Sequence, residues 1–160
     1  MLAAMSDCAL CANPDGGILW QDESCRVVLV EGDEGRDFPG FCRVVWQAHV
    51  AEMSELAAGE RRHLMNVVFA AELAVREVMR PDKINLASLG NVVPHLHWHV
   101  IPRWRGDSRF PAPIWSPRNP DSRAGAVSPK GTSFGAPPAP TFERLRTAFT
   151  RALAELQAES

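Results

Sequence analysis

Three histidines at alternate positions are the residues of this chain best suited to chemistry. His95, His97 and His99 are separated by apolar residues in the run His95-Leu96-His97-Trp98-His99-Val100-Ile101. Because strand side chains alternate between faces, the run predicts a β-strand with the imidazoles on one face and the apolar residues in the core. Near neutral pH, imidazoles bind metals, shuttle protons or attack electrophiles. The pattern therefore indicates a reactive site.

The cysteines form a second candidate constellation. Cys8 and Cys11 have the spacing of half a zinc site, which would need two more ligands from elsewhere; the alternative is a pair of small buried thiols. Cys25 and Cys42 lie in apolar runs and are predicted to pack as hydrophobic residues. His63 lies in a helical stretch among arginines and is predicted to be exposed to solvent.

Composition narrows the class of protein. A chain of 160 residues with 46% hydrophobic and 22% charged residues predicts one ordinary globular domain. The net charge of −2 argues against nucleic acid as a partner, and no Lys/Arg block or long apolar run indicates a membrane. The first residues lack the basic and apolar regions of a signal peptide. With only four cysteines, a reduced cytoplasmic location is expected.

Hydrophobic periodicity predicts an α+β fold. A helical period runs from about Ser54 or Ala58 to Met79, where Pro81 ends it, and a polar loop is expected at 31–40. Short β-branched and aromatic runs predict strands at 18–21, 25–30, 41–46, 83–87 and the histidine run. These elements favour a five-stranded antiparallel sheet with one long helix and a C-terminal helix.

The chain is expected to divide into three parts. Residues 1–105 form the catalytic domain, and 106–140 form a Pro/Gly-rich extension. Residues 141–160 contain the C-terminal helix, expected over Thr141 to Ala158. The extension holds large apolar residues and is predicted to drape over the domain; these residues are Phe110, Ile114, Trp115 and Phe134.

The run from Pro94 to Arg103, preceded by Asn85 and Gly90, resembles the signature of the histidine triad (HIT) superfamily. The resemblance extends over residues 8–105 and includes Pro39-Gly40 and His49. It implies a homodimer that acts on a nucleotide phosphate through a nucleotidyl-histidine intermediate. By position, it implies that His97 is the nucleophile, that His95 orients it through its backbone carbonyl, and that His99 contacts the phosphoryl oxygens and assists the leaving group.

The resemblance also implies further site residues. Asn85 matches a position that contacts ribose or phosphate, although a strand-end turn residue is the alternative. Gly90 and Asn91 stand where the family often has Gly-x-Ser/Thr, and Glu31 would hold the ribose hydroxyls. Some members hold a zinc ion with two cysteines and two histidines. By position, the ligands in this chain would be Cys8, Cys11, His49 and His95. No organic cofactor is expected.

The segment after the histidine run, residues 103–115, is predicted to line the leaving-group side of the site. Arg103, Arg105 and Arg109 would bind phosphate, and Trp104 and Trp115 would stack on bases; anchoring of the loop is the alternative for the aromatic residues. The long helix is apolar over more than one face, which together with the resemblance predicts a homodimer.

The expected function is a nucleotide-binding hydrolase or transferase with a purine nucleotide substrate. It would cleave at the α-phosphate of a nucleoside phosphoramidate or a dinucleoside polyphosphate; aminoacyl-adenylates present the same group. The alternatives are a zinc-dependent metallohydrolase that uses the histidine strand and a non-catalytic nucleotide-binding adaptor. Residues i and i+4 of a strand lie more than about 10 Å apart, so three alternate histidines rarely bind one ion.

Overall fold

The computed structural model describes residues 8–12, 16–122 and 140–159. Its elements follow the chain in the order α1 (Ala9–Ala12), β1 (Gly17–Gln21), β2 (Cys25–Leu29), α2 (Gly32–Asp37), β3 (Cys42–Trp46), the 3-10 helix η2 (Met53–Glu55), α3 (Ala58–Met79), β4 (Lys83–Ala87), β5 (His97–Arg103) and α4 (Pro140–Ala158). The predicted strands, long helix and terminal helix are all present, with ends shifted by one or two residues.

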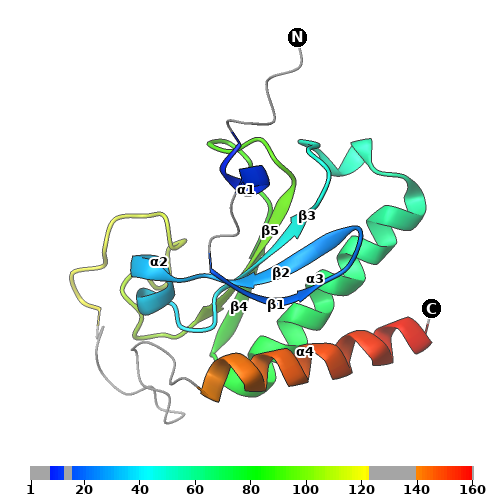
Figure 1. Cartoon of the computed structure of the whole chain (residues 1–160). Coiled ribbons are helices and arrows are strands. Elements are labelled where there is room, and N and C mark those ends of the chain that lie inside the picture. The colour runs from blue at the N-terminus through cyan, green and yellow to red at the C-terminus, as the bar shows by residue number, and fades with distance from the viewer. Residues whose placement is uncertain (1–7, 13–15, 123–139, 160) are drawn as a thin grey trace.

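The five strands form one antiparallel sheet in the order β1-β2-β3-β5-β4 (Figure 1). This confirms the predicted α+β fold. The strand β5 lies between β3 and β4, so it is hydrogen-bonded on both sides, while β1 and β4 form the edges. The register pairs Arg43 with His99 and Val45 with His97 across β3 and β5. A central, doubly paired strand holds its side chains in fixed positions.

One face of the sheet is covered by helices (Figure 1). Helix α3 contacts β2, β3 and β5, and α4 packs against α3 and β1. The apolar side chains Leu96 and Val100 lie in this core, and Trp98 packs against it, as the alternation predicted. Helix α3 ends where Arg80 adopts a left-handed conformation (φ 49°) before Pro81. None of the helices in the described ranges is long and apolar enough to cross a membrane.

Two local expectations were wrong. The predicted loop 31–40 contains the short helix α2. The histidine strand begins at His97, so His95 lies in the preceding loop and not on the strand face. The chain bends there because His95 N–H donates to the Val93 carbonyl at 2.8 Å, directly after Pro94.

His63 was also misjudged. Its side chain is only 27% exposed, and Nε2 donates a hydrogen bond of 2.6 Å to Oδ2 of Asp22, in the β1–β2 turn. The contact ties α3 to this turn, which no local pattern reveals. Cys25 and Cys42 are buried as predicted. Burial raises the pKa of the Cys42 thiol to about 12, so the thiol is uncharged at neutral pH.

The extension packs on the domain over its described part, residues 106–122. Ile114 is buried in a small cluster with Phe38, Phe41 and Ile101. Residues 123–139, including Phe134, lie outside the described ranges. Helix α4 buries the predicted apolar stripe of Leu145, Phe149 and Leu153 in the main core.

Candidate active site

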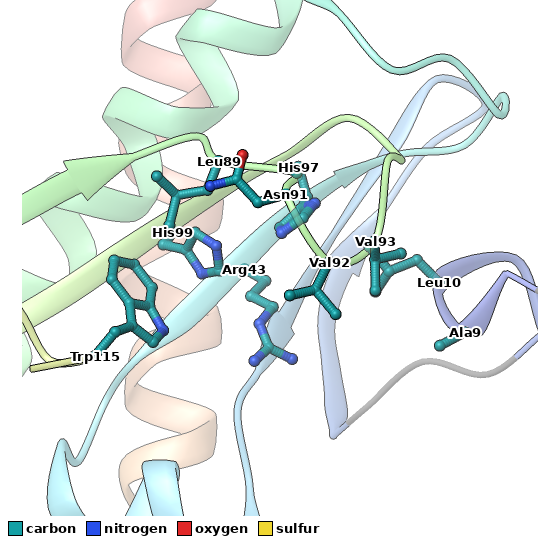
Figure 2. A pocket seen from close by; sticks show the side chains of 11 residues that line it. Ala9, Leu10, Arg43, Leu89, Asn91, Val92, Val93, His97, His99 and Trp115 are labelled. Atoms are coloured by element: carbon teal, nitrogen blue, oxygen red, sulfur yellow. The ribbon is translucent and has the colours of Figure 1, made fainter.

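A cavity of about 430 Å³ opens in front of β5, on the face of the sheet opposite α3 and α4 (Figure 2). His97 and His99 point into it from alternate positions of β5, and Arg43 reaches it from β3. The rest of the wall is largely apolar, with Asn91 as its one polar side chain; it is contributed by Ala9, Leu10, Leu89, Gly90, Asn91, Val92, Val93 and Trp115. The arrangement combines two imidazoles and a guanidinium with a largely apolar surface.

His97 is held in a single orientation. Its Nδ1 donates a hydrogen bond of 2.5 Å to the backbone carbonyl of His95. Burial lowers the pKa of His97; the bond to His95 opposes this, and the charge of Arg43 adds to the lowering. The ring is therefore neutral at physiological pH, with its proton on Nδ1. This leaves the lone pair of Nε2 available as a nucleophile.

His99 lies against its neighbours on both sides. Its ring centroid is 4.8 Å from that of His97 and 5.0 Å from that of Trp115. Burial, followed by the charges of His97 and Arg43, lowers the pKa of His99 to about 3. Its Nδ1 is buried and has no hydrogen-bond partner among the described residues. A neutral imidazole with an unmatched nitrogen is suited to a polar ligand group.

Arg43 is the cavity residue that the sequence interpretation missed. Its side chain is 18% exposed, and Nη2 donates a hydrogen bond of 2.9 Å to Oε2 of Glu34. The guanidinium also lies 5.5 Å from the ring centroid of Phe41. The available signal was a single charge in the apolar strand 41–46. Its significance depends on the pairing of β3 with β5, which the sequence does not specify.

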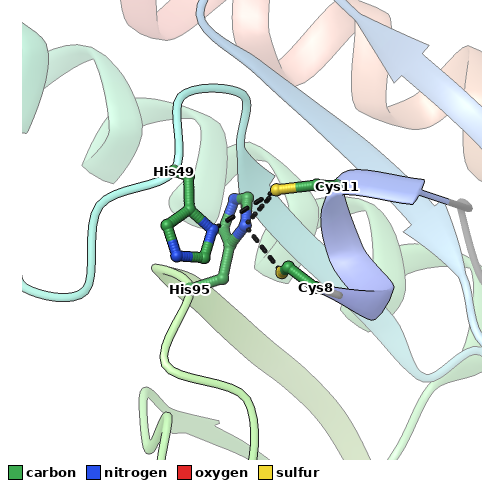
Figure 3. Close-up of side chains that lie close together, drawn as sticks. All are labelled: Cys8, Cys11, His49 and His95. Atoms are coloured by element: carbon green, nitrogen blue, oxygen red, sulfur yellow. Dashed lines mark hydrogen bonds between the residues drawn. The ribbon is translucent and has the colours of Figure 1, made fainter. Parts of the chain in front are cut away.

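His95 faces a different cluster (Figure 3). Its Nδ1 lies 3.4 Å from Sγ of both Cys8 and Cys11, and Sγ of Cys11 lies 3.3 Å from Nδ1 of His49. One ligand atom from each of the four residues lies within 4.8 Å of all the others. Sulfur and nitrogen ligands of tetrahedral zinc lie about 3.5 Å apart. The four side chains predicted from the sequence therefore fit a zinc ion.

The surroundings of this cluster also fit a metal. Nε2 of His95 donates to the carbonyl of Trp46 at 2.6 Å, which directs Nδ1 toward the thiols. Arg26 donates to the carbonyl of Leu10, which holds α1 beside the sheet. Burial and the neighbouring Cys8 raise the pKa of the Cys11 thiol, and the charge of Arg26 opposes this rise; a bound metal cation would favour the thiolate form that zinc requires.

Other predicted binding residues lie in different places. Gly90 and Asn91 line the cavity, and Gly90 has a positive φ of 73° that suits glycine. Glu31 lines a neighbouring cavity that shares Arg43 with the first. Asn85 lies outside the residues that line either cavity, and its Oδ1 accepts a hydrogen bond from Arg103.

Arg103 is buried, whereas an arginine that binds a substrate phosphate is expected to be accessible. It is 1% exposed, and its Nε and Nη2 donate to the two carboxylate oxygens of Asp107 at 2.8 and 3.0 Å. Two further N–H groups bond to Asn85 and to the carbonyl of Ala112. Four of the five N–H groups are thus used inside the protein, and the pair of Arg103 with Asp107 anchors the extension to β5.

The segment 103–115 contributes less to the cavity than predicted. Trp115 lines it, whereas Trp104 is buried in the core. Arg105 does not line the cavity, and Arg109 lines a separate hollow beside α2 that also includes Trp115. The guanidinium in front of the histidines comes from β3 instead.

Fold and site together define a protein with a paired-histidine cavity on an antiparallel sheet. The HIT domain family model matches residues 16–106, and the chain belongs to this family. A HIT-family structure from Marinobacter aquaeolei is 26% identical with a TM-score of 0.64, covering 86% of this chain and 90% of its own. A histidine triad protein of Bradyrhizobium japonicum is 24% identical with a TM-score of 0.64, covering 87% and 91%.

Two curated relatives match over shorter stretches. An AP-4-A phosphorylase of Mycobacterium tuberculosis is 35% identical over 78 residues, which is 45% of this chain and 40% of the relative. An uncharacterized HIT-like protein of Saccharolobus solfataricus is 30% identical over 74 residues, or 43% and 53%. The match thus spans about half or less of each curated relative.

Proposed function

We propose that this protein is a nucleotide hydrolase or transferase that uses His97 as a covalent nucleophile. Its substrate is a purine nucleotide activated at the α-phosphate, either a dinucleoside polyphosphate or a nucleoside phosphoramidate. The observation that carries the proposal is the hydrogen bond from Nδ1 of His97 to the carbonyl of His95. It fixes the tautomer in which Nε2 can attack, inside a cavity large enough for a nucleotide.

The reaction has two steps. The lone pair of His97 Nε2 attacks the α-phosphorus, an Nε2–P bond forms, and the bond from phosphorus to the leaving group breaks with its electron pair. Water, or inorganic phosphate in a transferase, then attacks the same phosphorus. The Nε2–P bond breaks, its electrons return to the imidazole, and the proton of the attacking water passes to solvent. His97 keeps its Nδ1 proton throughout, and the polar N–H of His99 stabilises the phosphoryl oxygens.

The apolar wall of the cavity suits the nucleoside. Leu10, Leu89, Val92 and Trp115 offer a surface against which a base and ribose can pack. The AP-4-A phosphorylase relative supports a substrate with linked phosphates. Glu31, in the neighbouring cavity, is the proposed partner of the ribose hydroxyls.

Zinc, where bound, would stabilise the structure and not take part in the reaction. Cys8, Cys11, His49 and His95 would hold it, and four protein ligands complete a tetrahedron without an open position for a catalytic water. The arrangement disfavours the metallohydrolase. We further propose that the protein is cytoplasmic, since its four cysteines form no disulfide. We also propose that it is a homodimer without nucleic-acid or membrane partners.

The test is turnover in the presence of a chelator. Purified protein is incubated with diadenosine tetraphosphate and an excess of EDTA, then quenched and analysed by intact-mass spectrometry. The expected results are continued hydrolysis and an acid-labile adenylate on the peptide that contains His97. Turnover by zinc-loaded protein that leaves no adenylate on His97, and that EDTA abolishes, would favour the metallohydrolase, because a purely structural zinc would leave the adenylate step in place. Tight nucleotide binding without turnover or adenylate would favour the adaptor.

A further inference from the structure

The cavity contains one formal charge. Among the described residues that line it, Arg43 is the only Arg, Lys, Asp or Glu. A guanidinium forms paired hydrogen bonds with phosphate oxygens, and these are strongest where water is excluded. The other lining residues are two histidines, Asn91 and apolar residues, so this guanidinium is the principal electrostatic partner for an anionic substrate.

The position of Arg43 relative to the histidines defines which phosphate it meets. The register pairs Arg43 with His99, whereas His97 is opposite Val45. The side chains of Arg43 and His99 therefore project side by side from the same face of the sheet. Both lie two residues along the strand direction from the position of His97, the proposed nucleophile. In an in-line displacement, the leaving group departs from the side of phosphorus opposite the attacking atom. Figure 2 shows the guanidinium extending from β3 into the cavity beyond the two rings.

We propose that Arg43 binds the phosphates of the leaving group, and that it makes the site selective for substrates whose α-phosphate carries further phosphates. The ligand class is a nucleoside polyphosphate or dinucleoside polyphosphate, in preference to a phosphoramidate with an uncharged amine. This specificity role rests on the proposed function, because it assigns a leaving group to the reaction at His97.

Glu34 holds Arg43 before substrate arrives. Nη2 of Arg43 bonds to Glu34, which lines the neighbouring cavity together with Arg43 and has a side chain that is 42% exposed. An incoming phosphate replaces one anionic partner of the guanidinium with another, so Arg43 never loses its charge compensation. The exposed carboxylate can return to water at little cost. The ring of Phe41 beneath the guanidinium keeps the side chain extended during the exchange.

The protonation state of His99 agrees with this substrate class. An amine must gain a proton to leave, and a His99 whose pKa is about 3 carries no extra proton to give at neutral pH. A polyphosphate leaves as a stable anion and requires charge stabilisation instead. Arg43 supplies that stabilisation at the position where the charge develops.

The experiment compares binding of two probes without any need for turnover. AMP carries the α-phosphate only, and α,β-methylene-ATP adds two phosphates beyond an uncleavable link. Isothermal titration calorimetry is performed on the full chain and on Arg43→Met. The affinity for α,β-methylene-ATP should fall at least about tenfold, the equivalent of one charge-assisted hydrogen-bonded contact, while AMP binding changes less than about threefold.

Matched variants separate charge from structure. Arg151→Met removes an exposed arginine of α4, paired with Glu77, and should leave both affinities unchanged. Arg43→Lys keeps the charge and should lose an intermediate amount of affinity for α,β-methylene-ATP. This variant also provides the test if Arg43→Met does not fold. Glu34→Gln removes the competing carboxylate and should raise the affinity for α,β-methylene-ATP. An equal loss for both probes in Arg43→Met, or in Arg43→Lys where only that variant folds, overturns the proposal.

A kinetic comparison distinguishes this proposal from the proposed function. In Arg43→Met, kcat/KM should fall more for diadenosine tetraphosphate than for adenosine 5′-phosphoramidate, by about tenfold or more. If wild-type protein turns over neither substrate, the proposed function fails, while the binding contrast still decides the role of Arg43. If both substrates lose the same factor, catalysis at His97 stands and the selectivity role of Arg43 is wrong.

Discussion

The backbone carbonyl of His95 lies 2.5 Å from Nδ1 of His97, while the imidazole of His95 lies against Cys8 and Cys11. One residue thus contacts the proposed nucleophile through its main chain and the candidate zinc cluster through its side chain. Because a metal ligand is fixed in position, ligation of His95 would also fix the carbonyl that orients His97. The N-terminal α1 is in this way connected to the ring of His97.

His97→Ala should abolish turnover while nucleotide binding persists. Loss of a covalent nucleophile costs several orders of magnitude in rate, whereas the apolar wall and Arg43 remain. Single-turnover assays and calorimetry with AMP measure the two properties separately. His63→Ala is the matched control, because His63 lies on α3 outside the cavity, and it should retain turnover. Activity near the wild-type level in His97→Ala would remove His97 from its proposed role.

Protein purified without chelator should contain about one zinc per chain. The four ligand atoms already have distances suited to a tetrahedral ion. Cys8→Ser and Cys11→Ser should lose the metal, while Cys42→Ala, which removes a buried core thiol, should keep it. Elemental analysis by mass spectrometry gives the stoichiometry. Less than about a tenth of an equivalent in wild-type protein never exposed to chelator would leave the cysteines as ordinary thiols.

Asp107→Asn should destabilise the protein by roughly 3–5 kcal/mol, because it leaves the buried Arg103 without its counter-charge. Asp107 also accepts bonds from the backbone N–H groups of Trp104, Arg109 and Phe110, so the extension should loosen. Urea denaturation measures the change in the free energy of unfolding. Asp37→Asn, which breaks the exposed pair with Arg118, should cost less than about 1 kcal/mol. Similar losses in both variants would contradict a structural role for Arg103.

Asp22→Asn should lower stability by roughly 1–2 kcal/mol at neutral pH, with a difference from wild type that shrinks in acid. Burial raises the pKa of Asp22, but hydrogen bonds from Cys25 N–H, Ser24 N–H and His63 outweigh it, so the pKa lies below its ordinary value. The stabilisation is therefore complete above the unfolded pKa of about 4 and is lost as the pH falls through the folded pKa.

Thermal unfolding of Asp22→Asn and wild type across pH 3 to 7 tests this dependence. Asp33→Asn serves as the control, because its carboxylate is exposed and pairs with Arg36 along the same helix. It should differ from wild type by less than about 0.5 kcal/mol at every pH. A difference between Asp22→Asn and wild type that stays constant down to pH 3 would show that the carboxylate charge contributes nothing.

The protein should be a dimer of about twice 17.6 kDa by light scattering at micromolar concentration. Most apolar residues of α3 are covered by the sheet and α4, but Phe69 and Leu73 are each 43% exposed and lie one helical turn apart. Replacement of both by Glu should shift the protein to monomer, while Glu72→Gln should not. A monomer mass for the wild-type protein would refute the dimer.

The sequence by itself determined the periodic elements. Alternation placed Leu96 and Val100 in the core, and the helical period with Pro81 set the extent of α3, because side-chain spacing along one element is a local property. The histidine pattern likewise identified His97 and His99 as neighbours. The Cys8–Cys11 pair, joined with His49 and His95 through the HIT resemblance, gave a cluster that the structure brings together.

Only the tertiary structure decided which elements meet. The insertion of β5 between β3 and β4 placed Arg43 beside His99, and the bend after Pro94 took His95 off the strand. Arg103 was expected to bind phosphate, but in the folded protein it is buried and paired with Asp107. Strand pairing and burial depend on contacts between residues distant in sequence, and the free energy of such contacts is not encoded in the spacing along either segment.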